Sequence, residues 1–406
     1  MARKTYPLAT LAVLTAINFV NYIDRSVLFA VQPLVQAEFK FTDTQYGFLT
    51  TSFFIFYMAA APFIGMAADR YSRKWIVFAG VVLWSGATLL TAIAHSYNGL
   101  LVRHTVVAIG ECSYATIAPA LLADLFPEER RGRMLAFFFL AIPVGTAMGY
   151  ILGGYLGHHF NWRMPFYVAA VPGFLLALLF LFLPEPERGS NDHLSATPDR
   201  ATLRGLAHNG AFWTATLGMA MMTFALGGIS VFLPKFLSQF RSMSLDHANL
   251  LLGVSIGVNG IVATLFGGWF GDRLLRRMDS AYYFVSAVGM ALGIPVMIVA
   301  LYVAGPSMVP AIAVAEFLLL MNTGPLNAAV VNSVSAQIRS SAIGVNLIVI
   351  HLLGDAFSPP LMGYISDRSS LPMAFIAAIV ATALSALVLF YGMRYAPRLG
   401  KLNSIV

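Results

Sequence analysis

Twelve long apolar runs, separated by short polar segments, constrain this chain more than any other feature of its sequence. Each run is long enough to cross a bilayer core, which needs about 20 consecutive apolar residues in a helix. The runs cover residues 8–34, 45–68, 75–95, 98–124, 133–157, 163–184, 209–239, 248–271, 279–304, 308–334, 341–365 and 371–396. They are continuous, whereas a membrane β-barrel requires alternating segments of about ten residues. The sequence therefore predicts an all-α membrane protein with twelve transmembrane helices.

The composition agrees with a lipid environment. Hydrophobic residues make up 58% of the chain and charged residues only 11%, whereas soluble proteins average about 25% charged residues. We therefore exclude a cytosolic enzyme, a secreted disulfide-rich domain and a disordered regulator. The single cysteine, Cys112, allows neither an internal disulfide nor a cysteine-based metal site. The first apolar run is too long for the hydrophobic region of a cleaved signal peptide, so we expect none.

The distribution of positive charge predicts the orientation in the membrane. If both termini are cytoplasmic, most of the 25 lysines and arginines fall in cytoplasmic segments, as the positive-inside rule requires. The exceptions are Lys40, Arg163, Arg241 and Arg368 on the outer side, and Arg25, Arg103 and Lys235 within apolar runs. The net charge of +7 is therefore mostly a topology signal, and we expect no nucleic-acid partner.

Two similar loop segments indicate that the chain has two related halves. The segment 65–74 reads GMAADRYSRK after the second run, and the segment 268–277 reads GWFGDRLLRR after the eighth. A polar stretch containing proline and glycine separates six runs from six. Because internal repeats mark duplicated architectures, we predict two pseudo-symmetric six-helix bundles, 1–184 and 209–406, joined by a cytoplasmic linker loop, 185–208.

Both loops resemble the G-x-x-x-D-R-x-x-R-[RK] signature of the major facilitator superfamily. The resemblance implies that Asp69 lies near the cytoplasmic N-terminal end of the eleventh helix, where the positive helix end favours an anion. Breaking that contact would accompany inward opening, and Gly65 would let two helices approach closely. The gating residues assigned in this way are Gly65, Asp69, Arg70, Arg73, Asp272 and Arg273. An ordinary basic turn is the alternative interpretation of one such loop.

Further segments resemble the Spinster branch of this superfamily, whose members move lysolipids and sphingosine phosphate. They are NYIDR at 21–25, GECSYATIAP at 110–119, AIPVG at 141–145 and HLLGDAFSP at 351–359. The branch usually has an arginine seven residues before the glutamate of its fourth helix. Here that position is His104, and Arg103 precedes it. Because a shift of one residue turns a helical side chain by about 100°, the sequence leaves open which of the two meets a ligand.

Ionisable residues inside the apolar runs are the candidate functional groups, since such residues usually face a cavity or a partner. We predict Asp24 and Glu111 as proton-coupling carboxylates, because a carboxylate that moves between apolar surroundings and a guanidinium changes its proton affinity. A static ion pair for Asp24 and a structural hydrogen bond for Glu111 are the alternatives. Arg25 and Arg103 suit an anionic head group, because a guanidinium offers paired donors to phosphate or carboxylate; plain charge balance is their alternative role.

A second polar site is predicted in the later runs. His351 and Asp355 are four residues apart, so they share one helix face and can form a hydrogen bond. Such a bond is either structural or part of a second titrating site, and no third residue completes a metal site. Glu316 is the approximate repeat counterpart of Glu111, and we assign it a structural role.

These features predict a monomeric, proton-coupled secondary transporter in the cell (inner) membrane, which moves an amphipathic, anionic, lipid-like substrate by alternating access. No cofactor or metal is expected. The alternatives are the same fold carrying a small organic anion or a drug, and a membrane sensor that binds without transport; no reactive constellation supports an enzyme. The predicted substrate contacts are Arg25, Arg103, His104, Tyr22, Tyr57, Tyr114 and Phe224, with Phe54 and Phe232 as further aromatic candidates that could equally be packing residues.

Overall fold

The computed structural model of the chain describes residues 6–188, 205–305, 307–334 and 338–397. Within these ranges every regular element is a helix. Twelve helical segments are long and apolar enough to cross a membrane: Pro7–Ala30, Asp43–Arg70, Arg73–Thr91, Tyr97–Leu125, Arg133–His159, Met164–Leu181, Gly210–Phe240, Leu245–Leu275, Ala281–Tyr302, Met308–Asn332, Ala342–Arg368 and Leu371–Tyr395. The prediction of twelve transmembrane helices is confirmed. Residues 189–204 of the predicted linker lie outside the described ranges.

The chain divides into two compact units, and each is described by itself. Unit 1 comprises Met1–Leu194 and Pro234–Gly257, and unit 2 comprises Ser195–Leu233 and Val258–Val406. The chain passes from unit 2 to unit 1 within helix α10 (Gly210–Phe240) and returns within α11 (Leu245–Leu275). The two six-helix bundles and their predicted boundaries remain a prediction.

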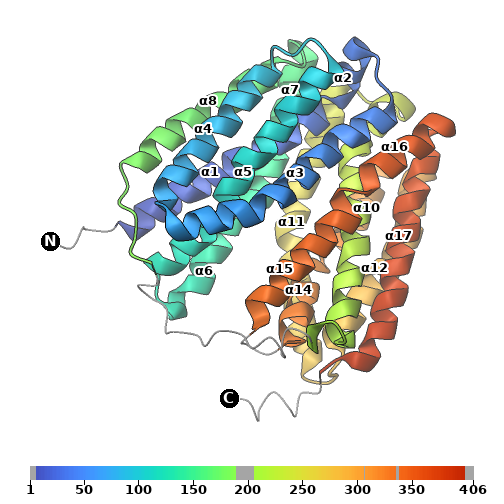
Figure 1. Ribbon diagram of the computed structural model, residues 1–406. Helices are drawn as coiled ribbons and strands as arrows, with labels where there is room; N and C mark the ends of the chain where they lie inside the picture. Colours follow the sequence, from blue (N-terminus) through green and yellow to red (C-terminus); the bar gives the residue numbers. More distant parts are fainter. Residues whose placement is uncertain (1–5, 189–204, 306, 335–337, 398–406) are drawn as a thin grey trace. The chain divides into compact units, whose positions relative to one another are not determined.

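Unit 1 begins with eight helices, coloured blue to green in Figure 1. They are α1 (Pro7–Ala30), α2 (Gln32–Phe39), α3 (Asp43–Arg70), α4 (Arg73–Thr91), α5 (Tyr97–Leu125), α6 (Glu128–Phe139), α7 (Ala141–His159) and α8 (Met164–Leu181). Helix α1 ends before the predicted run does, because Pro33, the second residue of α2, lacks the N–H donor that would continue a helix. The fifth predicted run covers parts of two helices, α6 and α7, which meet at Leu140.

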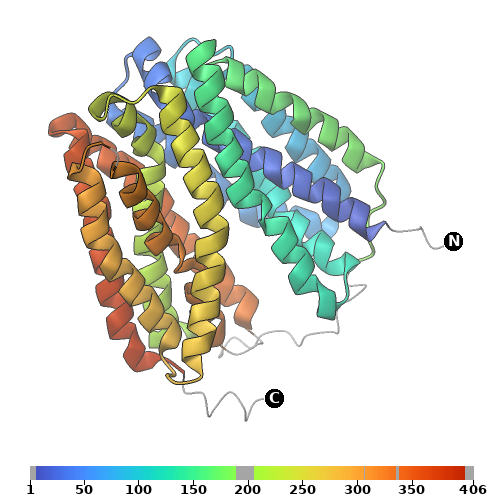
Figure 2. The ribbon, with the colours of Figure 1, turned by 180° about the vertical axis from the view of Figure 1, so that it is seen from behind.

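Unit 2 contains the later helices, coloured green to red and seen from behind in Figure 2. Besides its parts of α10 and α11, they are α12 (Ala281–Tyr302), α13 (Met308–Leu320), α14 (Thr323–Asn332), α15 (Arg339–Ile350), η2 (His351–Asp355), α16 (Ser358–Arg368), α17 (Leu371–Gly392) and η3 (Met393–Tyr395). The element η2 is a single π-helical turn within the eleventh span. Such turns are rare in helices and are frequent at functional sites.

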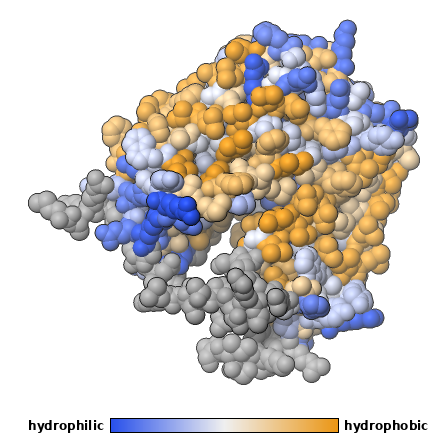
Figure 3. Space-filling model, viewed as in Figure 1, coloured by the Kyte–Doolittle hydropathy of each residue, from blue (hydrophilic) through white to orange (hydrophobic). Residues whose placement is uncertain are grey.

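The outer faces of the helices carry large apolar side chains. Leu175 and Phe182 near α8 and Leu387 on α17 are among many that are exposed, and Figure 3 shows extended apolar areas on the visible face. In water, exposed apolar area of this extent would be unfavourable. In lipid it is the expected surface of a membrane protein.

Small residues let α7 pack closely against α1. A Cβ atom added at Gly149 would lie 2.6 Å from the carbonyl oxygen of Ile23 and 2.6 Å from Cβ of Ser26. Gly145 would place its Cβ 2.6 Å from the carbonyl oxygen of Phe19. These distances are far below van der Waals contact, so the two helix backbones can meet only where the side chain is absent.

We expect Gly149→Ala to lower the free energy of unfolding by about 1–3 kcal/mol, because overpacking a tight core forces the backbone apart. Thermal unfolding of the detergent-solubilised protein measures this. The matched control is Gly344→Ala, since a Cβ atom at Gly344 on α15 would meet no atom within 4 Å. Alanine there should be neutral or slightly stabilising. Equal effects of the two changes would contradict the close packing of α1 and α7.

The parts of α10 and α11 that belong to unit 1 are tied to its other helices by polar contacts. The ammonium group of Lys235 forms an ion pair with Oδ1 of Asp43, which also accepts a hydrogen bond from Nε2 of Gln36 at 2.8 Å. The Asn249 side-chain amide donates to the carbonyl oxygen of Ala30 at 3.0 Å. Lys235, a charged residue within an apolar run, therefore has a partner inside unit 1.

Glu38 on α2 joins the start of α8 through charged hydrogen bonds. Its two carboxylate oxygens accept from Nη1 and Nη2 of Arg163 at 2.8 and 2.5 Å, and Nε1 of Trp162 donates to Oε2 at 2.5 Å. The hydrogen bonds from Arg163, helped by the one from Trp162, lower the pKa of Glu38 from its ordinary value of 4.5. Because the Glu38 side chain is 40% exposed, solvent screening limits the value of the pair.

The Glu38 contacts should weaken in acid. A carboxylate with a depressed pKa in the folded state contributes stability above its unfolded pKa, and this contribution is lost as the pH falls through the folded pKa. We expect Glu38→Gln to cost up to about 1 kcal/mol at neutral pH, as for an exposed ion pair. Thermal unfolding measured from neutral pH down to about pH 3 should then show the wild type and the variant converging. If the difference in melting temperature between the wild type and the variant persists in acid, the shape of the side chain, and not its charge, stabilises this contact.

Candidate functional site

A buried ion pair between α1 and α5 lies at the centre of the candidate site. Nε of Arg25 is 2.7 Å from Oε2 of Glu111, and the Glu111 side chain is completely buried while that of Arg25 is 18% exposed. Charges inside a membrane protein are costly unless they are paired. The pairing satisfies that requirement and brings together two residues that the sequence assigned to different roles.

Three aromatic rings surround the Arg25 guanidinium. Its Cζ atom lies 5.1 Å from the ring centre of Tyr22, 4.7 Å from that of Phe53 and 5.3 Å from that of Tyr57. These distances are within the range of cation–π attraction. The ring of His104 on α5 lies against that of Phe53, with 5.2 Å between the ring centres and an angle of 37° between the ring planes. Helices α1, α3 and α5 thus build a cationic centre with an aromatic wall.

Asp24, the neighbour of Arg25 on α1, points to a different helix. It is 6% exposed, and its Oδ2 accepts a hydrogen bond of 2.5 Å from the hydroxyl of Thr88 on α4. Arg25 pairs with Glu111 instead, as the turn of about 100° between successive helical residues allows. Asp24 and Glu111, both buried, therefore have different partners, a hydroxyl group for Asp24 and a guanidinium for Glu111.

Two polar groups near the pair have unused hydrogen-bonding capacity. The Asn21 side chain lies close to Glu111, yet Oε1 of Glu111 and Nδ2 of Asn21 both lack a hydrogen bond of good geometry. Farther along α5, Nη1 of Arg103 is buried without a hydrogen-bond partner, and it lies 3.8 Å from the position of a Cβ atom at Gly99. Because an unsatisfied buried polar atom costs free energy, Oε1 of Glu111 has spare capacity to accept a proton or a hydrogen bond, and the two nitrogens have spare capacity to donate one.

Two of the other predicted aromatic contacts, Tyr114 and Phe224, are buried in this structure. Tyr114 is buried in the core of unit 1, where its hydroxyl donates to the carbonyl oxygen of Leu14 and its ring meets Trp84 at 5.9 Å. Phe224 in unit 2 is buried and lies 6.3 Å from Phe357. Tyr22 and Tyr57 alone among the predicted aromatic contacts surround Arg25 in the part of the chain that is described.

The second polar site lies in unit 2. Nδ1 of His351 and Oδ2 of Asp355 are 2.7 Å apart at the two ends of η2. A Cβ atom at Gly227 would lie 2.8 Å from Oδ1 of Asp355, so α10 approaches this pair closely. Glu316 accepts a hydrogen bond of 3.1 Å from Asn259. Among the described residues, no group of three or more His, Cys, Asp or Glu side chains could hold a metal ion.

The predicted gating residues differ in their surroundings. Arg73 is buried against Asp124, with Nη1 2.5 Å from Oδ2, and its Nε lies 3.5 Å from Oε1 of Glu185. Asp69, Arg70, Asp272 and Arg273 are exposed. Asp272 accepts a hydrogen bond of 2.7 Å from the Tyr282 hydroxyl, and Arg273 lies over the ring of Trp269. Added Cβ atoms at Gly65 and Gly268 would meet nothing within 4 Å, so neither unit needs a glycine there for its own packing.

The family of the chain follows from comparison with known proteins. The profile of the Major Facilitator Superfamily matches residues 14–354. The chain belongs to this superfamily. Its members are membrane transporters and not enzymes, in agreement with the sequence-based expectation, and the chain is an integral multi-pass membrane protein.

Curated relatives place the chain in the Spinster branch of the superfamily. Protein spinster of Drosophila melanogaster is 32% identical over 375 residues, which are 88% of this chain and 62% of that protein. Protein spinster homolog 3 of Danio rerio is 33% identical, with 91% and 78% covered. Protein spinster homolog 1 of Homo sapiens is 33% identical, with 88% and 72% covered. The chain thus spans less than two thirds of the Drosophila protein, and the motif resemblance to this branch is confirmed.

Solved structures of other transporters share the fold. A bacterial homolog of the human lysosomal transporter Spinster, in an inward-facing and unoccupied conformation, is 24% identical and matches with a TM-score of 0.88 over 97% of this chain and 98% of that chain. A D-xylose–proton symporter is 17% identical, with a TM-score of 0.78 over 97% and 98%. The fold class predicted from the sequence, twelve helices in the major facilitator arrangement, is confirmed.

Sequence reasoning missed four residues of these networks. Thr88 and Phe53 carry no ionisable group, and nothing in the apolar runs distinguishes them from packing residues. No motif quoted above includes Asp124, at the end of the fourth predicted run, or Glu185, at the start of the predicted linker. A search for acidic residues that could pair with the buried Arg73 would have found both.

Proposed function

We propose that this protein is a proton-coupled secondary transporter, which moves an amphipathic, anionic, lipid-like molecule by alternating access. The observation that carries the proposal is the Arg25 centre, a guanidinium paired with Glu111 and walled by Tyr22, Phe53 and Tyr57. A cation beside aromatic rings suits a substrate with an anionic head and an apolar body. The fold and family agree with transport, as do the Spinster names of the relatives.

In this proposal the head group competes with Glu111 for Arg25. The guanidinium can offer paired donors to a phosphate or carboxylate, and elsewhere on α5 one nitrogen of Arg103 is buried without a hydrogen-bond partner. If a substrate anion takes over Arg25, the carboxylate of Glu111 loses its counter-charge. Neutralisation by a proton then removes a buried, unpaired charge, which links substrate binding to protonation.

Asp24 is the second proton-binding carboxylate of the proposal. Its partner is the Thr88 hydroxyl, which can reverse its role and accept a hydrogen bond once the carboxyl group is protonated. Asp24 can therefore gain or lose a proton without losing its hydrogen bond. His351 and Asp355 provide a further titratable pair, which we propose as a secondary polar site in unit 2.

The cytoplasmic loops are proposed to regulate opening. In each loop the exposed pair, Asp69 and Arg70 or Asp272 and Arg273, is free to exchange partners during the cycle. Arg73, by contrast, is buried and paired within unit 1, so we assign it an anchoring role. The protein would act as a monomer in the cell (inner) membrane, with both termini in the cytoplasm.

The test is uptake of a labelled lysophospholipid into proteoliposomes, with and without a pH gradient. We expect gradient-dependent uptake by the wild type and loss of the gradient dependence in Asp24→Asn. The control is Asp279→Asn, because Asp279 is an exposed acidic residue outside the site. This variant should behave like the wild type.

Each other outcome changes a specific part of the proposal. Uptake that ignores both the gradient and Asp24→Asn keeps the lipid substrate and rejects the proton coupling. No uptake by the folded wild type rejects the lipid and favours a small organic anion or a drug. Saturable binding without any accumulation favours a membrane sensor.

A further inference from the structure

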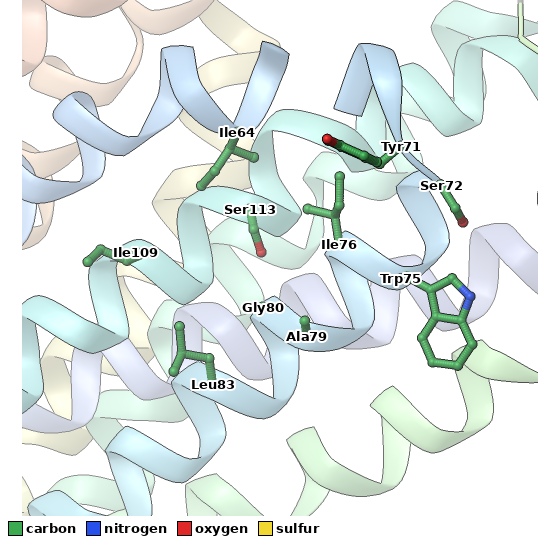
Figure 4. Close-up of a pocket in the computed structure, with 10 residues that line it drawn as sticks. All are labelled: Ile64, Tyr71, Ser72, Trp75, Ile76, Ala79, Gly80, Leu83, Ile109 and Ser113. Atoms are coloured by element: carbon green, nitrogen blue, oxygen red, sulfur yellow. The ribbon is translucent and has the colours of Figure 1, made fainter. Parts of the chain in front are cut away.

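Unit 1 has an apolar groove on its outer side, away from the residues that surround Arg25. It lies between α3 and α4, has a volume of about 580 Å³ and is lined by ten residues of α3, α4, α5 and the α3–α4 turn (Figure 4). Trp75 is 60% exposed and Leu83 43% exposed, so the groove opens onto the surface that would contact lipid. From Trp75 to Leu83 it runs about 12 Å along α4, at 1.5 Å per residue.

The packing of three helices explains why the groove exists. Helices α3 and α4 each pack along α5 but hardly contact one another. The contact of α4 with α5 is very close, because a Cβ atom at Gly110 would lie 2.8 Å from the carbonyl oxygen of Gly80. Helix α5 therefore forms the floor, and α3 and α4 form two walls that stand apart.

The lining consists mostly of apolar side chains, and its serine hydroxyls are already hydrogen-bonded within the protein. Its two serine hydroxyls already have acceptors, since Oγ of Ser113 donates to the carbonyl oxygen of Gly110 at 2.7 Å and Oγ of Ser72 donates to Glu185 at 2.5 Å. No charged residue is among the ten. A hydrocarbon chain can fill such a groove without leaving polar atoms unsatisfied.

Positive charge gathers at one end of the groove, at the turn between α3 and α4. Arg70 is exposed and Lys74 half-buried on either side of Tyr71 and Ser72. Arg188 reaches the same turn, where its guanidinium donates to the carbonyl oxygens of Ala68 and Tyr71.

Two acidic residues lie near this end. The Glu185 carboxylate accepts from Ser72 and from the backbone N–H groups of Arg73 and Lys74. Asp69 is exposed beside Arg70. The three cations outnumber these two acids, and the carboxylate of Glu185 already accepts from backbone N–H groups. This end of the groove therefore has a positive rim, and the charge distribution predicts that the end is cytoplasmic. The amphipathic ring of Trp75 at this end is typical of a membrane interface.

We propose that this groove binds one acyl chain of an anionic phospholipid from the surrounding bilayer, with the head group at Arg70 and Lys74. The site would be distinct from the transport site at Arg25. Two features of the groove determine the ligand class. The apolar lining accommodates a hydrocarbon chain, and the basic rim favours a negatively charged head group. Bilayer lipid is the occupant because the groove opens where bilayer lipid is already present at high concentration.

The proposal can be tested by photolabelling of the whole protein in nanodiscs. The probe is phosphatidylglycerol with a diazirine in one acyl chain, and the labelled peptides are mapped by mass spectrometry. We expect labels between residues 71 and 113 on α4 and α5, and weaker labelling by the matching phosphatidylcholine probe. Removing one cation by Arg70→Gln or Lys74→Gln should reduce phosphatidylglycerol labelling up to about fivefold.

A filled groove provides the control. Ala79 is exposed in the lining, so Ala79→Trp should abolish the labelling, whereas Leu90→Trp, at an exposed position of α4 outside the groove, should leave it unchanged. Thermal unfolding checks that both variants fold. Equal labelling of the two variants, or of the two lipid probes, would overturn the proposal. Displacement of the label by excess lysophospholipid, with lysophospholipid uptake lost in Ala79→Trp, would instead make the groove part of the substrate path and would also overturn it.

Discussion

Glu111→Gln should lower the free energy of unfolding by about 3–5 kcal/mol, because it removes one partner of a buried ion pair and leaves the other charge behind. Glu111 is completely buried and accepts from Nε of Arg25 at 2.7 Å. Glutamine has the same shape but no charge to balance the guanidinium. At about 2–4 °C per kcal/mol for domains of 150–250 residues, thermal unfolding in detergent should show a large decrease in melting temperature.

The charge pair itself can be isolated with a double-mutant cycle. Arg25→Gln should also destabilise the protein, but the double variant Arg25→Gln/Glu111→Gln should be more stable than the sum of the single effects predicts, by about 1–3 kcal/mol. In the double variant no uncompensated charge remains. Additive effects would contradict a direct pair between the two side chains. The same variants, assayed for lysophospholipid uptake, separate folding from function, because the double variant should fold and yet fail to bind an anionic substrate.

The ionisable part of the site could be predicted from the sequence because charges inside apolar runs are rare. Asp24, Arg25 and Glu111 stand out in a chain with 11% charged residues, and their cost in lipid requires a partner or a function. The partners could not be predicted in the same way. Which face of α1 meets α5 depends on the packing of α1 against α7 through Gly149. Thr88 on α4 and Phe53 on α3 reach the site through the packing of their own helices.

The transmembrane spans could likewise be predicted from the sequence, but not all of their internal breaks. Apolar length predicts each span, but not the places where a span contains more than one helical element. The turn between α1 and α2 follows from Pro33, which the sequence displays. No motif predicts the π-helical turn η2 (His351–Asp355), which lies where Gly227 of α10 closely approaches Asp355. The sequence therefore predicts local structure where the residue type alone determines it, as at Pro33. It does not predict local structure that depends on contacts with neighbouring helices.

Arg73→Gln should be as destabilising as the loss of Glu111, by about 3–5 kcal/mol, because it would leave Asp124 buried without its cation. The side chains of Arg73 and Asp124 are 8% and 7% exposed, and their closest atoms are 2.5 Å apart. The guanidinium also donates to the carbonyl oxygen of Pro186 at 3.1 Å, so it fastens α4 to α5 and to the segment that follows α8. Thermal unfolding in detergent measures the loss.

The repeat offers a matched control for this prediction. Arg276 occupies the corresponding position of the second loop but is exposed, and an exposed substitution is usually worth less than about 0.5 kcal/mol. Arg276→Gln should therefore leave the melting temperature nearly unchanged. The sequence motif assigns Arg73 to gating, whereas its burial assigns it to anchoring. If Arg73→Gln melts like the wild type and only transport changes, the gating role holds. If the melting temperature falls and Asp124→Asn restores it in the double variant, the two copies of one motif have different physical roles, because Arg73 is buried against Asp124 whereas Arg276 is exposed.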